Sequence, residues 1–212
     1  LVVIVDLDET SGEDVQKLKA DGHVVQCYFS VGTMEPFRDD VKANKTAWQS
    51  AVVGKMADWN EGWLDLTKMD LLKQLQGPRF VRAKAKGCDA LELDNVDCYD
   101  NRDCASKTGT KLSRDQVKAL QIAYNTWQVQ TAHAMGMAVS LKNAIDLIPD
   151  MVHLYDFAVN EQCAQYRECG KYQPFLDQDK AVLNVEYKTN KRWCVGARAL
   201  GIRSIQCRGK GG

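Results

Sequence analysis

The chain has 212 residues, with 28 basic and 28 acidic side chains and therefore no formal net charge. Hydrophobic residues make up 45% and charged residues 26%, which excludes a disordered chain and fits a globular protein. The balanced charge lacks the basic footprint of a nucleic-acid binder, and the apolar runs are too short to span a membrane, so we expect neither partner.

Seven short apolar runs, most of them ending in polar residues, predict buried strands. They cover residues 2–8, 24–30, 88–94, 137–143, 155–162, 181–187 and 202–207. Helical periodicity predicts helices over 15–20, 78–86, 115–135 and 192–200, each followed by a glycine that stops it. Pro78 is expected in a first helical turn, and Ser113 as an N-cap. Strands that alternate with helices predict a parallel sheet, and no Pro-, Gly- or Ser-rich linker divides the chain, so we expect one domain over residues 1–212.

Two architectures fit seven such strands. An open doubly wound sheet usually carries a glycine-rich phosphate loop after its first strand, but residues 8–12 read DETSG and contain neither GxGxxG nor GxxxxGK[ST]. A (β/α)8 barrel gathers functional residues at the C-terminal ends of many strands. Six strands here end in polar side chains. Each of these strand ends, taken alone, fits a solvated sheet edge. Six of them together favour a barrel with one strand missing, short or unrecognised.

The eight cysteines include two pairs with the same spacing, Cys98 with Cys104 and Cys163 with Cys169. Neither spacing fits a zinc site, so local disulfides in an oxidising compartment are the better interpretation. Asn44-Lys45-Thr46 is a glycosylation sequon, which fits secretion. Buried free thiols remain an equal alternative for two of the other four cysteines, and the pairing of these four stays open. They are Cys27, Cys88, Cys194 and Cys207, the first two being the candidates for burial.

The candidate catalytic groups at the predicted strand ends are carboxylates. The chain has no HExxH or GxSxG motif, and its three histidines are expected in structural or surface positions, so a Ser–His or Cys–His mechanism lacks its base. Asp94 ends one predicted strand and Glu161 lies at the end of another, and one of the two cysteine loops follows each of them. Glycoside hydrolysis needs such a pair of opposed carboxylates.

Further polar and aromatic residues near the strand ends are candidates for substrate binding. They are Asp6, Asp8, Tyr28, Asp97, Tyr99, Lys142, Asn160, Gln162, Glu186 and Tyr187. Trp59 and Trp63 fit sugar stacking or burial under a loop equally well. The acidic run 94–103 offers calcium ligands but fails the EF-hand spacing, and we expect no metal. The basic residues 79–86 are expected to form a solvated helix face.

Several segments, taken together, resemble glycoside hydrolase family 114, the endo-α-1,4-polygalactosaminidases. They are VQCYFSVG (25–32), WLDL (63–66), GCDALELDNVD (87–97), SLKN (140–143), FAVNEQC (157–163) and NVEY (184–187). The resemblance implies a secreted (β/α)8 barrel that acts without a metal or other cofactor. It also implies cleavage of α-1,4-linked galactosamine polymers of the galactosaminogalactan type, such as those of biofilms. The proposed catalytic pair of the family falls on Asp94 and Glu161.

The resemblance also bears on the start of the barrel. In the family a strand precedes the segment that residues 4–10 resemble, so we expect a barrel that lacks its first strand in this chain. Ile4, Asp8-Glu9, Leu93 and Cys98 depart from the family motifs. These departures leave the polymer and the number of sugar subsites open.

The expected mechanism retains the anomeric configuration. Asp94 attacks as the nucleophile and Glu161 serves as acid and base, which requires a raised pKa for Glu161 and a carboxyl separation of about 5–5.5 Å. Because deacetylated galactosamine is a cation, we expect the strand-end acids to give a negative potential. These are Asp6, Asp8, Asp97 and Glu186, with Lys142 as the main local cation. A non-catalytic carbohydrate-binding barrel and a disulfide-bonded interaction protein are the alternatives, and a monomer is expected throughout.

Overall fold

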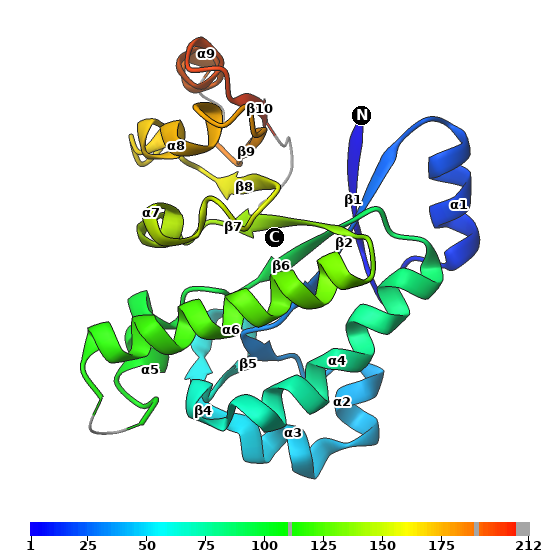
Figure 1. Ribbon diagram of the computed structural model, residues 1–212, viewed down its shortest axis with the longest axis vertical. Helices are drawn as coiled ribbons and strands as arrows, with labels where there is room; N and C mark the ends of the chain where they lie inside the picture. The colour runs from blue at the N-terminus through cyan, green and yellow to red at the C-terminus, as the bar shows by residue number, and fades with distance from the viewer. Residues whose placement is uncertain (110–111, 189–190, 207–212) are drawn as a thin grey trace. The chain divides into compact units, whose positions relative to one another are not determined.

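The computed structural model describes residues 1–109, 112–188 and 191–206, and the chain divides into two compact units, Leu1–Val139 and Ser140–Gly212 (Figure 1). None of the helices in these ranges is both long enough and apolar enough to cross a membrane.

The first unit is built around three parallel strands. They are β1 (Val2–Asp6), β2 (Val24–Ser30) and β6 (Ala90–Asp94), in the order β1-β2-β6. Their register places Asp6 beside Tyr28 and Ser30 beside Asp94. Because the strands are parallel, the polar residues that end them meet at one edge of the sheet.

Two helices of this unit are followed by the predicted glycines, Gly22 and Gly136, and one of them confirms the predicted N-cap Ser113. α1 (Gly12–Ala20) is capped by Ser11 and is followed by Gly22, whose φ is 82°. α6 (Arg114–Ala134) begins with a capping box in which Ser113 and Gln116 satisfy each other's backbone N–H groups. Both helices therefore begin and end where short side chains and glycine satisfy the orphan backbone groups.

The third long helix, α4 (Met69–Lys86), differs from the prediction. Pro78 lies inside it rather than in its first turn. A proline removes one backbone hydrogen bond, but the helix buries Leu72, Leu75, Phe80 and Ala83 on one side. This apolar stripe holds the turn before Pro78 in the helix. Phe80 packs edge-on against Phe29 of β2, with ring centroids 5.4 Å apart.

A three-stranded antiparallel sheet, which the sequence analysis missed, follows β2 directly. Its order is β3 (Thr33–Met34), β5 (Glu61–Leu64) and β4 (Val52–Met56). These strands are too short to show a clear period. Short helices complete the unit. They are α2 (Asp39–Ala43), α3 (Lys45–Ala51), η1 (Ala57–Trp59), η2 (Leu66–Lys68), η3 (Cys98–Asp100) and α5 (Arg102–Ala105).

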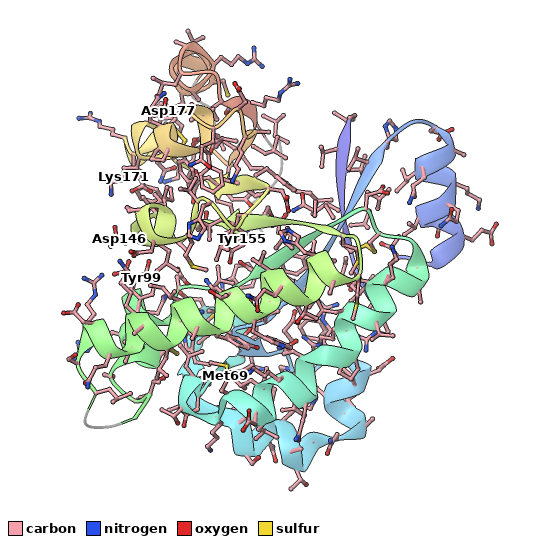
Figure 2. All side chains as sticks on the ribbon, in the orientation of Figure 1. Met69, Tyr99, Asp146, Tyr155, Lys171 and Asp177 are labelled. Atoms are coloured by element: carbon pink, nitrogen blue, oxygen red, sulfur yellow. A yellow bond between two sulfur atoms is a disulfide. The ribbon has the colours of Figure 1, made fainter. Side chains whose placement is uncertain are left out.

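The second unit continues the alternation of parallel strands and helices. Its strands are β7 (Ala138–Lys142), β8 (Phe157–Glu161), β9 (Val182–Glu186) and β10 (Arg203–Gln206), in that order. The helices between them are η4 (Ile145–Leu147), α7 (Ile148–Met151), η5 (Cys169–Tyr172), α8 (Gln173–Leu176) and α9 (Lys191–Ala199). Tyr155 is buried, whereas Lys171 and Asp177 lie on the surface (Figure 2). The seven predicted strands are thus all present.

Three disulfides join described cysteines. Cys98–Cys104 and Cys163–Cys169 confirm the two predicted local pairs. Cys27–Cys88 ties β2 to the segment that enters β6, which resolves the open alternative of two buried free thiols. Cys194 forms no disulfide with any residue that the structure describes, and Cys207 lies outside the described residues.

Candidate active site

Asp94 lies at the C-terminal end of β6, where the first unit brings two of the predicted site residues together. Its Oδ2 accepts a hydrogen bond of 3.0 Å from the hydroxyl of Tyr28. Its backbone carbonyl accepts bonds of 3.1 and 3.3 Å from the N–H groups of Val31 and Gly32, which follow β2. Both the side chain and the peptide of Asp94 are therefore held by the neighbouring strand.

Asp97 and Tyr99 follow in the next turn. Burial, together with the negative charges of Asp94 and Asp100, raises the pKa of Asp97 to about 6. Tyr99 is only 3% exposed, and the Arg114 guanidinium lies 5.7 Å from its ring centroid. Tyr99 therefore has little ring surface left for stacking on a sugar.

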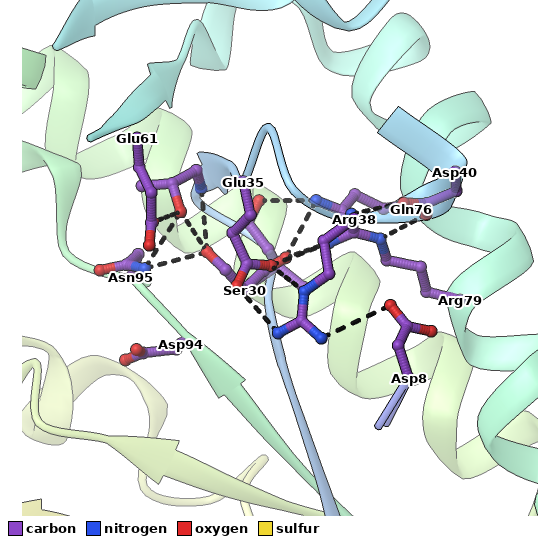
Figure 3. A network of polar contacts seen from close by, with 12 residues as sticks. Asp8, Ser30, Glu35, Arg38, Asp40, Glu61, Gln76, Arg79, Asp94 and Asn95 are labelled. Carbon is purple, nitrogen blue, oxygen red and sulfur yellow. Dashed lines mark hydrogen bonds and ion pairs between the residues drawn. The ribbon is translucent and has the colours of Figure 1, made fainter. Parts of the chain in front are cut away.

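Asp6 and Asp8 belong to an ionic network. Arg38 donates to both carboxylate oxygens of Asp6, at 2.6 and 2.7 Å. It also lies 3.5 Å from Asp8, and Figure 3 shows this ion pair. Arg82 lies 2.9 Å from Asp8. Burial acts to raise the pKa of Asp6, but the Arg38 guanidinium and backbone N–H groups lower it below its usual range. The arginines therefore offset much of the negative potential expected from these two acids.

The same network corrects the expectation that the bases at 79–86 form a solvated face. Arg79 is fully buried, donates to both oxygens of Asp40 and lies 4.7 Å from the ring of Trp48. A guanidinium is buried in this way only when a carboxylate pairs with it, and Asp40 supplies that carboxylate. No periodic pattern marks this pair, because α2, which carries Asp40, is only five residues long.

Glu161, at the end of β8, is the centre of the polar cluster in the second unit. Its Oε1 accepts a hydrogen bond of 2.5 Å from Tyr187, and its Oε2 accepts one of 3.1 Å from Asn143. The ammonium group of Lys142 lies 3.5 Å from Oε2. Lys142, Glu161 and Tyr187, three of the predicted residues, are thus brought together.

The expectation of a raised pKa for Glu161 is wrong in these surroundings. Burial acts to raise the pKa, but the charge of Lys142 and the hydrogen bonds from Tyr187 and Asn143 more than offset it, and the pKa lies below its usual range. Each of these contacts stabilises the ionised carboxylate.

Asn143 is a site residue that the sequence analysis did not select. It has a φ of 49°, a left-handed conformation that asparagine tolerates better than most residues. Its side-chain oxygen accepts from the N–H of Glu161 at 2.9 Å, while its amide donates to the carboxylate. The available signal was an asparagine at the end of the predicted strand 137–143.

Three other predicted residues of this unit make contacts within the protein. Asn160 is 1% exposed, donates to the Tyr172 hydroxyl and accepts from the N–H of Cys163. Glu186 is fully buried and accepts from the N–H of Ala164. The side chain of Gln162 donates to Gln165. Asn160 and Glu186 therefore anchor the start of the disulfide loop that follows Glu161.

The structure also separates the two tryptophan candidates. Trp59 is 60% exposed, whereas Trp63 is 2% exposed and belongs to the core. Only Trp59 keeps a free face for a ligand. In the ranges that the structure describes, no group of three or more His, Cys, Asp or Glu side chains is placed to hold a metal ion.

Each unit thus presents a carboxylate at a strand end with a tyrosine hydroxyl bound to it, Asp94 with Tyr28 and Glu161 with Tyr187. Acids at the C-terminal ends of parallel strands are typical of glycosidases with a (β/α)8 fold. A family model for glycoside hydrolase family GH114 matches residues 1–208, and the chain belongs to this family. It is therefore a glycosidase.

Solved structures agree with this assignment. Ega3 of Aspergillus fumigatus, in a crystal structure with galactosamine, is 30% identical, with a TM-score of 0.83 over 97% of this chain and 82% of that one. The glycoside hydrolase domain of PelA from Pseudomonas aeruginosa is 15% identical, with a TM-score of 0.72 over 97% of this chain and 86% of that one. These matches confirm the fold class. No curated protein matches the chain.

Proposed function

We propose that the chain is a secreted, endo-acting hydrolase of α-1,4-linked galactosamine polymers. The observation that carries the proposal is the likeness to Ega3, which was crystallised with galactosamine and which this chain matches over 97% of its length. Both units are proposed to belong to one catalytic domain over residues 1–212. The three disulfides support secretion, because such bonds persist in oxidising compartments.

In the proposed mechanism, Asp94 attacks the anomeric carbon and forms a glycosyl–enzyme ester. Glu161 protonates the departing glycosidic oxygen, then removes a proton from the water that hydrolyses the ester. Tyr28 supports this role of Asp94 because its hydroxyl donates to Oδ2 and so holds the carboxylate at the strand end. The retaining mechanism requires a separation of about 5–5.5 Å between the carboxyl groups of Asp94 and Glu161. This distance stays a prediction.

The surroundings of Glu161 constrain its acid role. A general acid must be protonated before it can donate, and Lys142 favours the ionised form. We therefore expect the activity to be greatest in acidic solution, where Glu161 binds a proton.

The substrate assignment is tested with deacetylated and fully acetylated α-1,4-galactosamine polymers, with new reducing ends measured over time. The proposal predicts faster cleavage of the deacetylated polymer and a rapid fall in its mean length, since endo-cleavage cuts internal bonds. Equal rates on the two polymers would overturn the preference for the cationic sugar. Release of single sugars without a fall in polymer length would overturn endo-action.

A carbohydrate-binding protein without turnover is the second candidate, and the ion pair between Lys142 and Glu161 is the observation that favours it. Titration calorimetry with galactosamine oligomers, followed by mass analysis of the same samples, separates the two. Binding with intact oligomers would favour the second candidate, and shortened oligomers would exclude it.

A further inference from the structure

A hydrogen-bonded group of four polar side chains includes Asn95, the residue that follows Asp94 (Figure 3). Its other members are Ser30, Thr33 and Glu61. The amide of Asn95 donates to the hydroxyls of Ser30 and Thr33, at 2.9 and 3.2 Å. These two hydroxyls lie 2.5 Å apart, and the Thr33 hydroxyl donates to Oε2 of Glu61 at 2.6 Å. Ser30 and Thr33 are fully buried, so water does not compete for these bonds.

The Glu61 carboxylate can only accept, and this fixes which hydroxyl donates in each hydrogen bond of the group. Thr33 has one hydroxyl proton, and it goes to the carboxylate, so the Ser30 hydroxyl must donate to Thr33. Ser30 then accepts from the amide of Asn95 and from the N–H of Thr33, at 3.1 Å. Both hydroxyls therefore use their single donor. A buried group whose hydroxyls are satisfied in this way rigidifies the backbone that it connects.

The backbone held by this group is the peptide between Asp94 and Asn95. Asn95 is left-handed, with a φ of 61°. A Cβ atom on Gly32 would lie 1.7 Å from the carbonyl oxygen of Asn95, so this close approach requires glycine. With the bonds from Val31 and Gly32 to the carbonyl of Asp94, the turn is fixed on both sides. The direction of the Asp94 side chain is set by this turn.

We propose that Thr33 and Asn95, with Glu61 as the terminal acceptor, are positioning residues that hold Asp94 in its attacking orientation. The inference rests on the proposed function, in which Asp94 is the nucleophile. These residues act through the peptide and Cα of Asp94. Loss of the group therefore lowers the rate of bond cleavage and leaves the affinity for substrate nearly unchanged, because a displacement of about 1 Å costs on the order of a hundredfold in rate.

The first test uses Thr33→Val and Thr33→Ser. Valine keeps the β-branched shape but loses the hydroxyl, and serine keeps the hydroxyl. Thr33→Val is expected to lower kcat roughly tenfold to a hundredfold with little change in KM, and Thr33→Ser to restore most of the loss. Thr126→Val is the matched control, because the one hydrogen bond of its hydroxyl within the described ranges goes to the carbonyl of Ile122 in α6 itself. Equal kcat values for valine and serine at position 33 would overturn the inference.

A second variant, Asn95→Gly, covers a failure of Thr33→Val to fold. Asn95→Gly keeps the left-handed backbone and removes the amide, so it is expected to lower kcat as Thr33→Val does while its melting temperature stays close to that of the wild type. Wild-type kcat in Asn95→Gly would contradict the inference. Absence of turnover in the wild-type enzyme would instead contradict the proposed function, so the two failures are distinguishable.

Discussion

Lys142 controls the protonation of Glu161 in the second unit. Lys142→Met removes the cation 3.5 Å from the carboxylate and therefore raises the pKa of Glu161. Because the acid role requires the protonated form, the alkaline limb of the kcat/KM profile is expected to move to higher pH. The measurement is kcat/KM on a galactosamine oligomer across the pH range. Movement of the acidic limb instead would show that the ionised form is the active one.

The ionised side chain of Asp97 destabilises the folded state, so the size of the effect depends on pH. Its pKa of about 6 in the folded chain exceeds the ordinary value of 3.8, so the folded state binds the proton more tightly and loses stability as pH rises between these values. The loss is on the order of 2–3 kcal/mol above pH 6.

Asp97→Asn removes the buried charge with little change in shape. We expect a higher melting temperature than wild type at pH 7.5 and no gain at pH 4, where the wild-type carboxyl is already protonated. Thermal unfolding at the two pH values checks this. An equal gain at both would mean that the charge of Asp97 is not the cause.

The two catalytic candidates could be predicted because each is the polar end of an apolar run and lies in a family motif. Asn143 also ends an apolar run and lies in the SLKN motif, but its contact with Glu161 could not be predicted, and Glu61 lies in no such pattern. Their roles depend on a left-handed turn and on a hydroxyl from another strand, and neither of these has a local sequence signature. Arg79 was misplaced because its partner Asp40 lies far from it in the chain.

Among the elements, the parallel strands and the glycine-terminated helices were predictable, since period and stop signals are local. The antiparallel sheet β3-β5-β4 was not, because pairing between short strands is a long-range property. α4 begins at Met69 and not at Pro78. A proline fits the first turn of a helix better than its interior and therefore suggested a later start.

We expect two of the disulfides to differ in their main effect, one on stability and the other on activity. Cys27–Cys88 spans 61 positions and Cys163–Cys169 spans 6. Chain entropy then gives about 4 kcal/mol for the first and about 2 kcal/mol for the second. We expect the Cys27→Ala/Cys88→Ala variant to lose more unfolding free energy in urea. The Cys163→Ala/Cys169→Ala variant is expected to lose more activity, because its loop follows Glu161. The reverse order of activity losses would contradict a role for that loop.

For the whole chain, a net charge of zero conceals local pairing of charges. Asp6, Asp8 and Asp40 meet arginines in the first unit, while the carboxylates of Asp94 and Glu161 accept hydrogen bonds from tyrosines. The strand-end acids therefore divide into those that stabilise the fold and those proposed to act on a sugar.

The proposed pair is tested first by Asp94→Asn, which removes the attacking charge and keeps the size and shape of the side chain. We expect turnover of galactosamine oligomers to be lost while the circular dichroism spectrum and melting temperature stay near those of the wild type. A variant that cleaves at the wild-type rate would contradict the nucleophilic role.

Proton NMR of the first product formed from α-1,4-linked galactosamine oligomers distinguishes the retaining mechanism from an inverting one. A retaining hydrolase releases the α-anomer first, and mutarotation then produces the β-anomer. We expect this order for the wild-type chain. Initial release of the β-anomer would contradict the retaining mechanism, and intact oligomers throughout would contradict the proposed function.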